Sequence, residues 1–438
     1  MRIKQIEVTG LFGMFDHVIP LNMEDRITII YGLNGVGKTA TLKLLSFFFN
    51  LDFSDFSELE NIPFKTVKMK FDNDRFIQVN QKHSDKLSRQ ETTISFSGEN
   101  IDISLTNLRL LSHKKNLEKE YKGLIENKEY NLDVSDYLED LELEIAELQE
   151  RIKEKKLKEI PDWLDSILND FNVRFIESQR LFKFSDNVES FRKSINLSVN
   201  QCANELSKNI KNKLAEYSQM SQLLDRTFPM RIIQQQEIEK ISDENLRIKL
   251  SEIEAKRYKL INVGLLDKDE DTDFQIPEKI DETINKFLSV YVEDVEKKLS
   301  VFDDLAERIE IFKRIINQRF SYKQINIDKD AGFTFTCNGS PLSPEKLSSG
   351  EQHELIILYE LLFKVPPNSL ILIDEPEISL HVEWQVHFLK DLQEITRISD
   401  IDVVIATHSP DIIHDRWDLT VELKGSRNER NTNTESYC

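Results

Sequence analysis

The sequence predicts an α/β domain that is interrupted by a long helical insertion. Residues 1–110 and 320–425 contain most of the glycines and prolines, together with short runs of β-forming residues. Between Leu124 and Ala331 there are one glycine and three prolines, and a region so poor in helix breakers is expected to be largely helical. Apolar runs in the flanks suit a parallel sheet that is covered on both faces. The two flanks are therefore expected to be halves of one domain.

The apolar and alternating runs in the flanks are predicted to be strands. Ile27–Tyr31 is predicted to be a buried strand. The predicted strands of an antiparallel side sheet are Val67–Phe71, Phe76–Val79 and Thr93–Phe96. The runs suited to the parallel sheet are Val173–Ile176, Leu370–Asp374 and Val403–Thr407.

Apolar residues in the middle region recur at alternating steps of three and four. The series is Leu288, Val292, Val295, Leu299, Phe302, Ala306 and Ile309, with Phe312 and Ile316 beyond it. This spacing predicts one helix from about Glu278 to Asn317, roughly 60 Å long at ~1.5 Å per residue. A coiled-coil seam and an amphipathic helix in a bundle explain the spacing equally well.

These patterns predict four parts of the chain. They are an N-terminal domain half (1–180, with a helical segment at about 113–160), a helical insertion (185–320), a C-terminal domain half (321–424) and a disordered tail (425–438). The tail has no apolar face, which is typical of disordered segments.

Composition limits the classes of function. The net charge of −20 argues against a grip on nucleic acid over the whole surface, although a local basic patch stays compatible with it. The three cysteines, Cys202, Cys337 and Cys438, lack metal-ligand spacing, so thiols in a reducing compartment are expected. No apolar run is long enough to cross a bilayer, and the N-terminus does not resemble a signal peptide. A cytoplasmic protein without membrane contact is expected.

A phosphate-binding loop is predicted at 32–39. The segment GLNGVGKT fits the pattern G-x-x-x-x-G-K-[ST], follows a predicted strand and precedes the helical pattern Ala40–Phe49. Backbone N–H groups of such a loop surround phosphate oxygens, and the helix start adds positive potential. Lys38 is expected to reach the β- and γ-phosphates of ATP, and the Thr39 hydroxyl to bind Mg²⁺. The predicted nucleotide-binding residues are Asn34, Gly35, Val36, Gly37, Lys38 and Thr39.

Two further strand ends carry polar side chains. Asp374 and Glu375 follow the apolar run at 370–373, and His408 follows the run at 403–407. Asp374 is expected to hold Mg²⁺ through water, and Glu375 to deprotonate the attacking water. His408 is a candidate sensor of the γ-phosphate, because open α/β sheets bind ligands at the ends of their strands; a structural histidine is the alternative.

These three segments resemble the head of ABC-type ATPases. The stretch LSSGEQ (347–352) is similar to the signature motif of that superfamily, ahead of the strand with the acids and at the start of a predicted helix, Gln352–Phe363. The resemblance implies that Ser348 and Gly350 contact the γ-phosphate held by a second head, so that ATP joins two copies. Without the resemblance, LSSGEQ is a capped helix start with Ser348 or Ser349 as N-cap.

The sequences LSSGEQ, DEPEISLH and ATHSP resemble those of the SMC-like and OLD-like branch of the ABC-type ATPases. This implies a P-loop NTPase of ABC type with a mixed central sheet, an antiparallel side sheet and a helical, partly coiled-coil-like insertion. Gln179, in VRFIESQRL, is similar to the glutamine of a Q-loop, which contacts Mg²⁺. The implied cofactors are ATP and Mg²⁺.

The phrases FIESQRL and LIDEPEISLHVEWQ resemble stand-alone ATPases of bacterial anti-phage systems, such as the Septu ATPase PtuA and the PARIS ATPase AriA. This implies an ATPase that forms a homodimer or higher homo-oligomer through its heads and controls a separate effector, expected to be a nuclease. The alternative is a RecF- or SMC-like repair ATPase that clamps DNA. A transporter motor fits least, since no membrane segment is expected.

Overall fold

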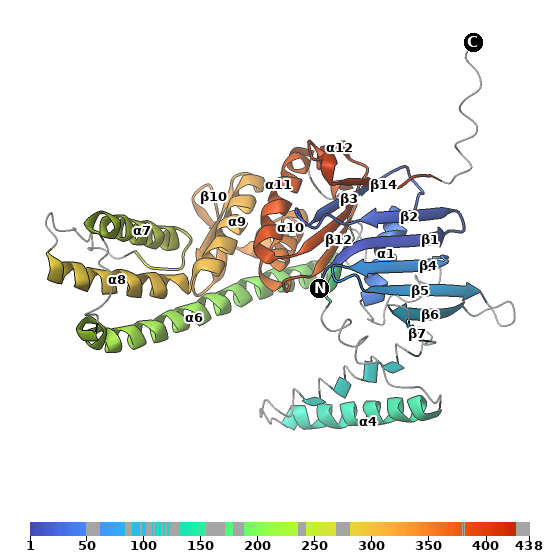
Figure 1. Cartoon of the computed structure of the whole chain (residues 1–438), viewed down its shortest axis with the longest axis horizontal. Helices are drawn as coiled ribbons and strands as arrows, with labels where there is room; N and C mark the ends of the chain where they lie inside the picture. The colour runs from blue at the N-terminus through green and yellow to red at the C-terminus, as the bar shows by residue number, and fades with distance from the viewer. Residues whose placement is uncertain are drawn as a thin grey trace, which may run out of the picture. The chain divides into compact units, whose positions relative to one another are not determined.

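The computed structural model describes two units of the chain (Figure 1). It describes residues 1–49, 62–83, 90–96, 99–101, parts of 107–122, 132–154, 171–177, 188–234, 242–268, 281–378, 380 and 382–425. We call Met1–Arg180 with Pro366–Cys438 the phosphate-loop unit, and Leu181–Val365 the helical unit. Residues 321–365 are therefore grouped with the helices, whereas the predicted division placed a boundary at 320.

A five-stranded parallel sheet lies in the phosphate-loop unit. Its spatial order is β14 (Thr420–Glu422), β3 (Ile27–Tyr31), β13 (Asp402–Ala406), β12 (Leu370–Asp374) and β8 (Val173–Glu177). Every pairing among these strands is parallel. All residues of β12 and β13 are buried, which explains their unbroken apolar sequences, since a strand covered on both faces exposes no polar side. The predicted α/β class is confirmed.

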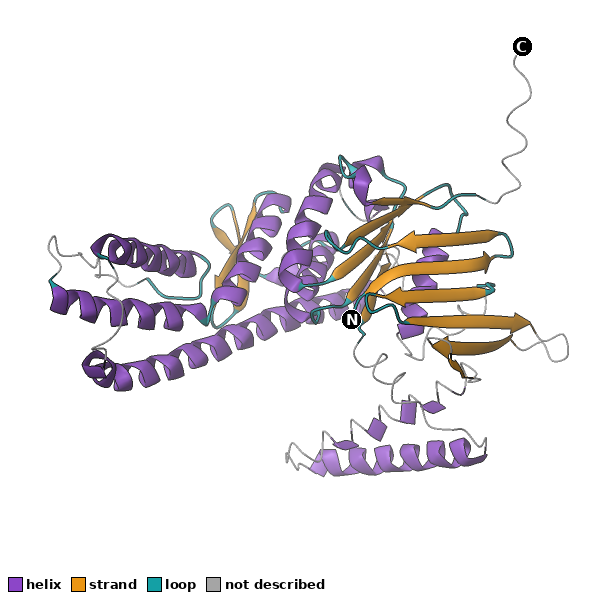
Figure 2. Ribbon diagram, in the orientation of Figure 1, coloured by secondary structure: helices purple, strands orange, loops and turns teal. Residues whose placement is uncertain are grey.

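The second sheet of this unit is antiparallel and six-stranded (Figure 2). Its order is β2 (Phe15–Pro20), β1 (Ile3–Leu11), β4 (Thr66–Phe71), β5 (Phe76–His83), β6 (Gln90–Phe96) and β7 (Glu99–Ile101). This confirms the predicted side sheet. Residues from both sheets and from helix α1 (Lys38–Phe49) form one apolar core, to which Ile6, Leu42 and Leu372 belong. The core therefore ties the phosphate loop, at the start of α1, to both sheets.

Three more helices of this unit are described: α4 (Leu132–Glu154), α11 (Val382–Ser399) and α12 (Pro410–Ile413). Helix α4 lies inside the predicted helical segment and packs Leu141 and Leu148 against Leu117. In the part of the chain that the structure describes, no helix is both long and apolar enough to cross a membrane.

The helical unit combines long helices with a small sheet. Its elements are α6 (Val188–Gln234), α7 (Asp243–Asn262), α8 (Glu282–Ser300), α9 (Asp303–Arg319), β9 (Lys323–Asp328), β10 (Gly332–Cys337), β11 (Ser340–Leu342) and α10 (Ser349–Tyr359). The described residues between 185 and 320 are helical apart from short connections. Helix α8 packs against both α6 and α7, as expected of an amphipathic helix in a bundle.

The single helix predicted from Glu278 to Asn317 is wrong. The chain instead forms α8 and α9, which are separated at Val301 and Phe302. Phe302 is fully buried and stacks at an angle on Tyr217, with ring centroids 5.4 Å apart. Apolar residues on both sides of the break stay buried, among them Leu299, Phe302 and Ala306.

Candidate nucleotide-binding site

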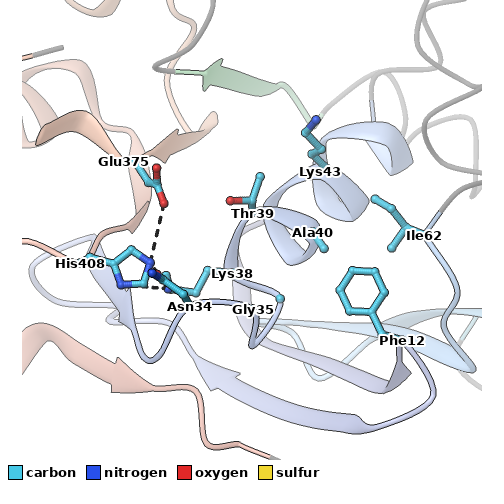
Figure 3. Close-up of a pocket in the computed structure, with 11 residues that line it drawn as sticks. Phe12, Asn34, Gly35, Lys38, Thr39, Ala40, Lys43, Ile62, Glu375 and His408 are labelled. Atoms are coloured by element: carbon cyan, nitrogen blue, oxygen red, sulfur yellow. Dashed lines mark hydrogen bonds and ion pairs between the residues drawn. The ribbon is translucent and has the colours of Figure 1, made fainter. Parts of the chain in front are cut away.

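Three neighbouring strands bring the predicted site residues together. The phosphate loop follows β3, His408 comes two residues after β13, and Glu375 directly follows β12. Strands β3, β13 and β12 are adjacent and parallel, so their carboxyl ends meet at one edge of the sheet. Because β13 is the middle strand, the histidine lies between the loop and Glu375 (Figure 3).

The phosphate loop depends on glycine at two positions. Gly37 has a φ of +94°, and a Cβ there would lie 2.4 Å from Leu11 Cδ2, so a side chain would push the loop away from β1. Gly35 has a φ of +84°, with no described atom within 4 Å of a Cβ; it is needed for its backbone conformation, which other residues rarely adopt. The loop leads directly into α1, whose N-terminal end attracts phosphate.

Lys38 is buried at the base of the loop, with 5% of its surface exposed. Its Nζ donates to the carbonyl oxygens of Gly32 (3.0 Å) and Leu33 (3.3 Å) and lies 2.5 Å from His408 Nε2. An ammonium group only donates, so Nε2 of the histidine accepts this bond. Burial lowers the pKa of Lys38, and the carboxylates of Glu375 and Asp374 oppose that shift.

Thr39 and Asp374 fit the requirements of a magnesium ion. The Thr39 hydroxyl donates to Asp374 Oδ1 at 3.0 Å, so two oxygen ligands lie side by side next to the phosphate loop. The described residues contain no cluster of three or more His, Cys, Asp or Glu side chains suited to a metal. Mg²⁺ uses one or two protein oxygens and takes its other ligands from phosphates and water, so the pair formed by Thr39 and Asp374 suits this ion.

Glu375 adopts an unusual backbone conformation. Its φ is +44°, and its N–H donates to the carbonyl oxygen of Ala406 at 2.7 Å. Its carboxylate lies 3.7 Å from His408 Nε2. Left-handed conformations of this kind cost about 1–3 kcal/mol at residues other than glycine and cluster at functional sites. The conformation therefore supports Glu375 as a functional residue.

A cavity of about 680 Å³ opens beside these residues, within the size range of small-molecule sites. Four residues that the sequence analysis did not assign to the site also line it, namely Phe12, Ala40, Lys43 and Ile62 (Figure 3). Phe12 follows β1, with a φ of +51° and 39% of its surface exposed. Its position in the glycine-flanked sequence GLFGM is a signal that could have revealed it, since a large apolar residue in a turn is unusual.

His17 of β2 holds the loop from the other side. It is 3% exposed, and its Nε2 lies 2.7 Å from the carbonyl oxygen of Val36. Burial lowers the pKa of His17, which favours a neutral ring whose Nε2–H donates to that carbonyl. The backbone of Val36, one of the predicted nucleotide-binding residues, is thereby fixed. No sequence pattern marked this histidine, because its partner is a backbone atom.

The signature stretch lies in the helical unit. Ser348 is the N-cap of α10: its Oγ accepts from the Glu351 N–H at 3.3 Å, while its own N–H donates to Glu351 Oε2 at 2.7 Å. The alternative of a capped helix start is thus confirmed, with Ser348 rather than Ser349 as the cap. Ser348 and Gly350 are both exposed. Gln179 lies outside the described residues.

The comparisons with known proteins cover different shares of the chain, and the chain matches about a quarter of the length of its curated relative. Protein ea59 of Escherichia phage lambda is 29% identical over 121 residues, which are 27% of this chain and 23% of that protein. The Smc head domain with an extended coiled coil from Pyrococcus furiosus, solved bound to the C-terminal domain of ScpA, is 14% identical with a TM-score of 0.38, covering 97% of this chain and 94% of that one. The SMC head domain from Thermotoga maritima is 11% identical with a TM-score of 0.35, covering 94% and 91%.

The family assignment rests on a broader match. The family model of the AAA ATPase domain matches residues 1–413, a range that includes the phosphate loop, both strand-end acids and His408. The chain therefore belongs to the AAA ATPase domain family and is an ATPase.

Proposed function

We propose that this site hydrolyses ATP with Mg²⁺, using Glu375 as the base and His408 as the contact to the γ-phosphate. One observation carries the proposal: Lys38, His408 and Glu375 lie at the ends of three adjacent strands, and His408 Nε2 is 2.5 Å from Lys38 Nζ and 3.7 Å from the Glu375 carboxylate. The lysine suits the γ-phosphate, the histidine suits a sensor of that phosphate, and the carboxylate suits activation of the attacking water.

Each residue has a separate task in this reaction. Loop N–H groups and Lys38 bind the phosphates. Thr39 and Asp374 would hold Mg²⁺, which would neutralise charge on the phosphate oxygens. Glu375 orients a water molecule and takes its proton as the oxygen attacks the γ-phosphorus. The bond from that phosphorus to the bridging oxygen breaks, and ADP and phosphate leave.

Two substitutions test these assignments. Lys38→Ala is expected to abolish ATP binding, because it removes the cation that faces the phosphates. Glu375→Gln is expected to retain ATP binding and to lose turnover, since the metal site stays and the base does not. Nucleotide titration and phosphate release measure the two effects, with Glu24→Gln on an exposed turn as the control for the same chemical change. Normal turnover of the Glu375→Gln protein contradicts the assignment.

We further propose that two copies pair around ATP, with Ser348 and Gly350 of each copy contacting the γ-phosphate of the other. Support comes from the exposure of both residues at a helix start and from the chemistry of a hydroxyl and backbone N–H groups, which can donate to an anion but cannot act as a general acid or base at neutral pH.

The biological role that we propose is control of a separate effector, expected to be a nuclease, in anti-phage defence. The resemblance of FIESQRL and LIDEPEISLHVEWQ to such ATPases and the net charge of −20 support it over the alternative, a RecF- or SMC-like ATPase that clamps DNA, because acidic surfaces repel phosphate backbones. Plaque counts decide between them in a host that carries this gene with its genomic neighbours. Protection that is lost with Lys38→Ala supports defence. Unchanged plaque counts together with salt-sensitive, ATP-dependent DNA binding support the clamp.

A further inference from the structure

Glu377 connects the turn after β12 to the segment that carries His408. It lies on the short turn Pro376–Ile378, two residues after Glu375. One of its carboxylate oxygens accepts from the Thr407 hydroxyl and the other accepts from the His408 N–H, each at 2.8 Å. Each oxygen of the side chain therefore accepts one hydrogen bond from the segment Thr407–Ser409, which we call the histidine segment.

A second set of hydrogen bonds closes the same connection. The Ser409 hydroxyl donates to Gln385 Oε1 at 3.1 Å. Gln385 Nε2 in turn donates to the carbonyl oxygens of Glu377 and Leu380, each at 3.2 Å. Thr407, which is fully buried, also accepts from the Ser409 N–H at 3.0 Å. Thr407 and His408 thus donate hydrogen bonds to the carboxylate of Glu377, and Ser409 donates one to the amide oxygen of Gln385.

The sheet itself cannot supply this connection. The ladder between β12 and β13 ends at the pair Asp374 and Ala406, with one more bond from the Glu375 N–H to Ala406. Beyond that point the two chains continue as a turn and a loop. A side chain must therefore fix the backbone of His408 relative to Glu375, and Glu377 is the residue that reaches it.

We propose that Glu377 is a positioning residue that sets the distance between His408 and Glu375. The inference rests on the proposed function, in which His408 contacts the γ-phosphate and Glu375 activates water. Removing the carboxylate frees the N–H of His408 and allows the imidazole to leave its place 3.7 Å from Glu375. In the described part of the chain, this carboxylate accepts its hydrogen bonds from the histidine segment, and its charge acts on Lys38 less than the charges of Glu375 and Asp374 do.

The first measurement separates kcat from KM. Glu377→Ala is expected to lower kcat on the order of 10- to 100-fold, the effect of a catalytic group displaced by about 1 Å, and to leave KM for ATP nearly unchanged. Glu377→Gln keeps one acceptor oxygen and is expected to lie between Glu377→Ala and the unchanged protein. The control is Asp328→Ala, which removes a carboxylate that accepts two backbone N–H groups, from Asp330 and Ala331, in the turn after β9. It is expected to leave kcat unchanged.

The second measurement is a double-mutant cycle with His408→Ala. If Glu377 acts through the histidine, adding Glu377→Ala to His408→Ala lowers kcat no further. A folded Glu377→Ala protein with normal kcat, or a further loss in the His408→Ala background, overturns the inference. A normal kcat of the His408→Ala protein contradicts the proposed function of the histidine. A lowered kcat of His408→Ala with a normal kcat of Glu377→Ala contradicts only the positioning role of Glu377, so the two failures are distinguishable.

A less disruptive substitution covers loss of folding. Thr407→Val is nearly isosteric and removes one of the two groups that Glu377 accepts. Like Glu377→Gln, it is expected to lower kcat. A thermal unfolding curve of the variant serves to show that the protein is folded. Normal kcat in the Thr407→Val protein, when Glu377→Ala does not fold, overturns the inference.

Discussion

Single side chains decide how the phosphate loop is shaped and what it presents to a ligand. Gly37 leaves room for Leu11, and His17 holds the carbonyl of Val36 from the neighbouring sheet. Lys38 is kept in place by two loop carbonyls and by His408. The loop is therefore fixed before nucleotide arrives, which lowers the entropy that binding must overcome.

Phe12 is expected to contact the nucleotide through its ring. It lines the cavity beside the phosphate loop and stays 39% exposed. Phe12→Ala should weaken ATP binding by about 1–2 kcal/mol, the range of base stacking on an aromatic ring, which is roughly 5- to 30-fold in KM with kcat unchanged. Met14→Ala is the control, because Met14 lies on the same turn, is 62% exposed and does not line the cavity. Equal KM values for the two variants would contradict the expectation.

At the scale of elements, the strands of the site were predictable and the arrangement of the helices was not. The runs ITIIY and LILID are recognisable as buried strands because they consist mainly of β-branched and other apolar residues, with no charged residue before the last position. The ends of these strands then place Asp374, Glu375 and the loop. Glu377, Gln385 and His17 were missed because their partners are distant backbone atoms or side chains, which no local pattern encodes.

The break between α8 and α9 shows a different limit. Its N-cap position is Phe302, which makes no side-chain capping bond, so the usual Ser, Thr, Asn or Asp signal is absent. Asp303 and Asp304 in the first turn of α9 favour a helix start there. The preference of these two aspartates for a helix start is too weak to predict a break, because the apolar spacing continues across it and predicts one continuous helix.

The contact between α6 and α8 includes an ion pair between a buried carboxylate, Asp294, and a partly exposed arginine, Arg231. Asp294 is 3% exposed and accepts from both Nη atoms of Arg231, the second at 2.6 Å. Arg231→Ala is expected to lower the free energy of unfolding by about 3 kcal/mol, because it removes the partner of a buried carboxylate. Lys297→Ala, in a pair with Glu293 whose side chains are both 52% exposed, should cost about 0.5 kcal/mol or less. Denaturant unfolding of the whole chain measures both; equal effects would show that the pair of Asp294 and Arg231 contributes no more than the exposed one.

At the scale of the whole molecule, the two units carry different parts of the proposed reaction. The phosphate-loop unit holds the residues that bind phosphate, metal and water, and the helical unit holds Ser348 and Gly350. Arg319 and Glu354 join α9 to α10 by an ion pair whose side chains are 6% and 10% exposed. Lys323 of β9 pairs with Glu351 of α10, so the signature helix is attached both to α9 and to the small sheet. Motion of the helical unit would therefore carry Ser348 with it.

The capping role of Ser348 and its proposed contact to ATP predict different results. As a helix cap, Ser348 contributes about 1 kcal/mol of stability and Ser348→Ala should leave turnover normal. As a γ-phosphate contact, its loss should leave a folded protein that binds ATP and does not hydrolyse it. Thermal unfolding, nucleotide binding and phosphate release of one variant give all three quantities.

Mixing two inactive variants tests whether Ser348 acts on the ATP of a second copy. A pair formed by a Ser348→Arg chain and a Lys38→Ala chain contains one site with Lys38 intact on one copy and Ser348 intact on the other. ATPase activity should therefore return on mixing, in proportion to the mixed pairs. The control mixture of Glu375→Gln with Lys38→Ala should stay inactive, because every site in that pair lacks either Lys38 or Glu375 on the copy that binds ATP. If mixed pairs form and the first mixture stays inactive, Ser348 serves its own chain, and the capping box with Glu351 is its whole function.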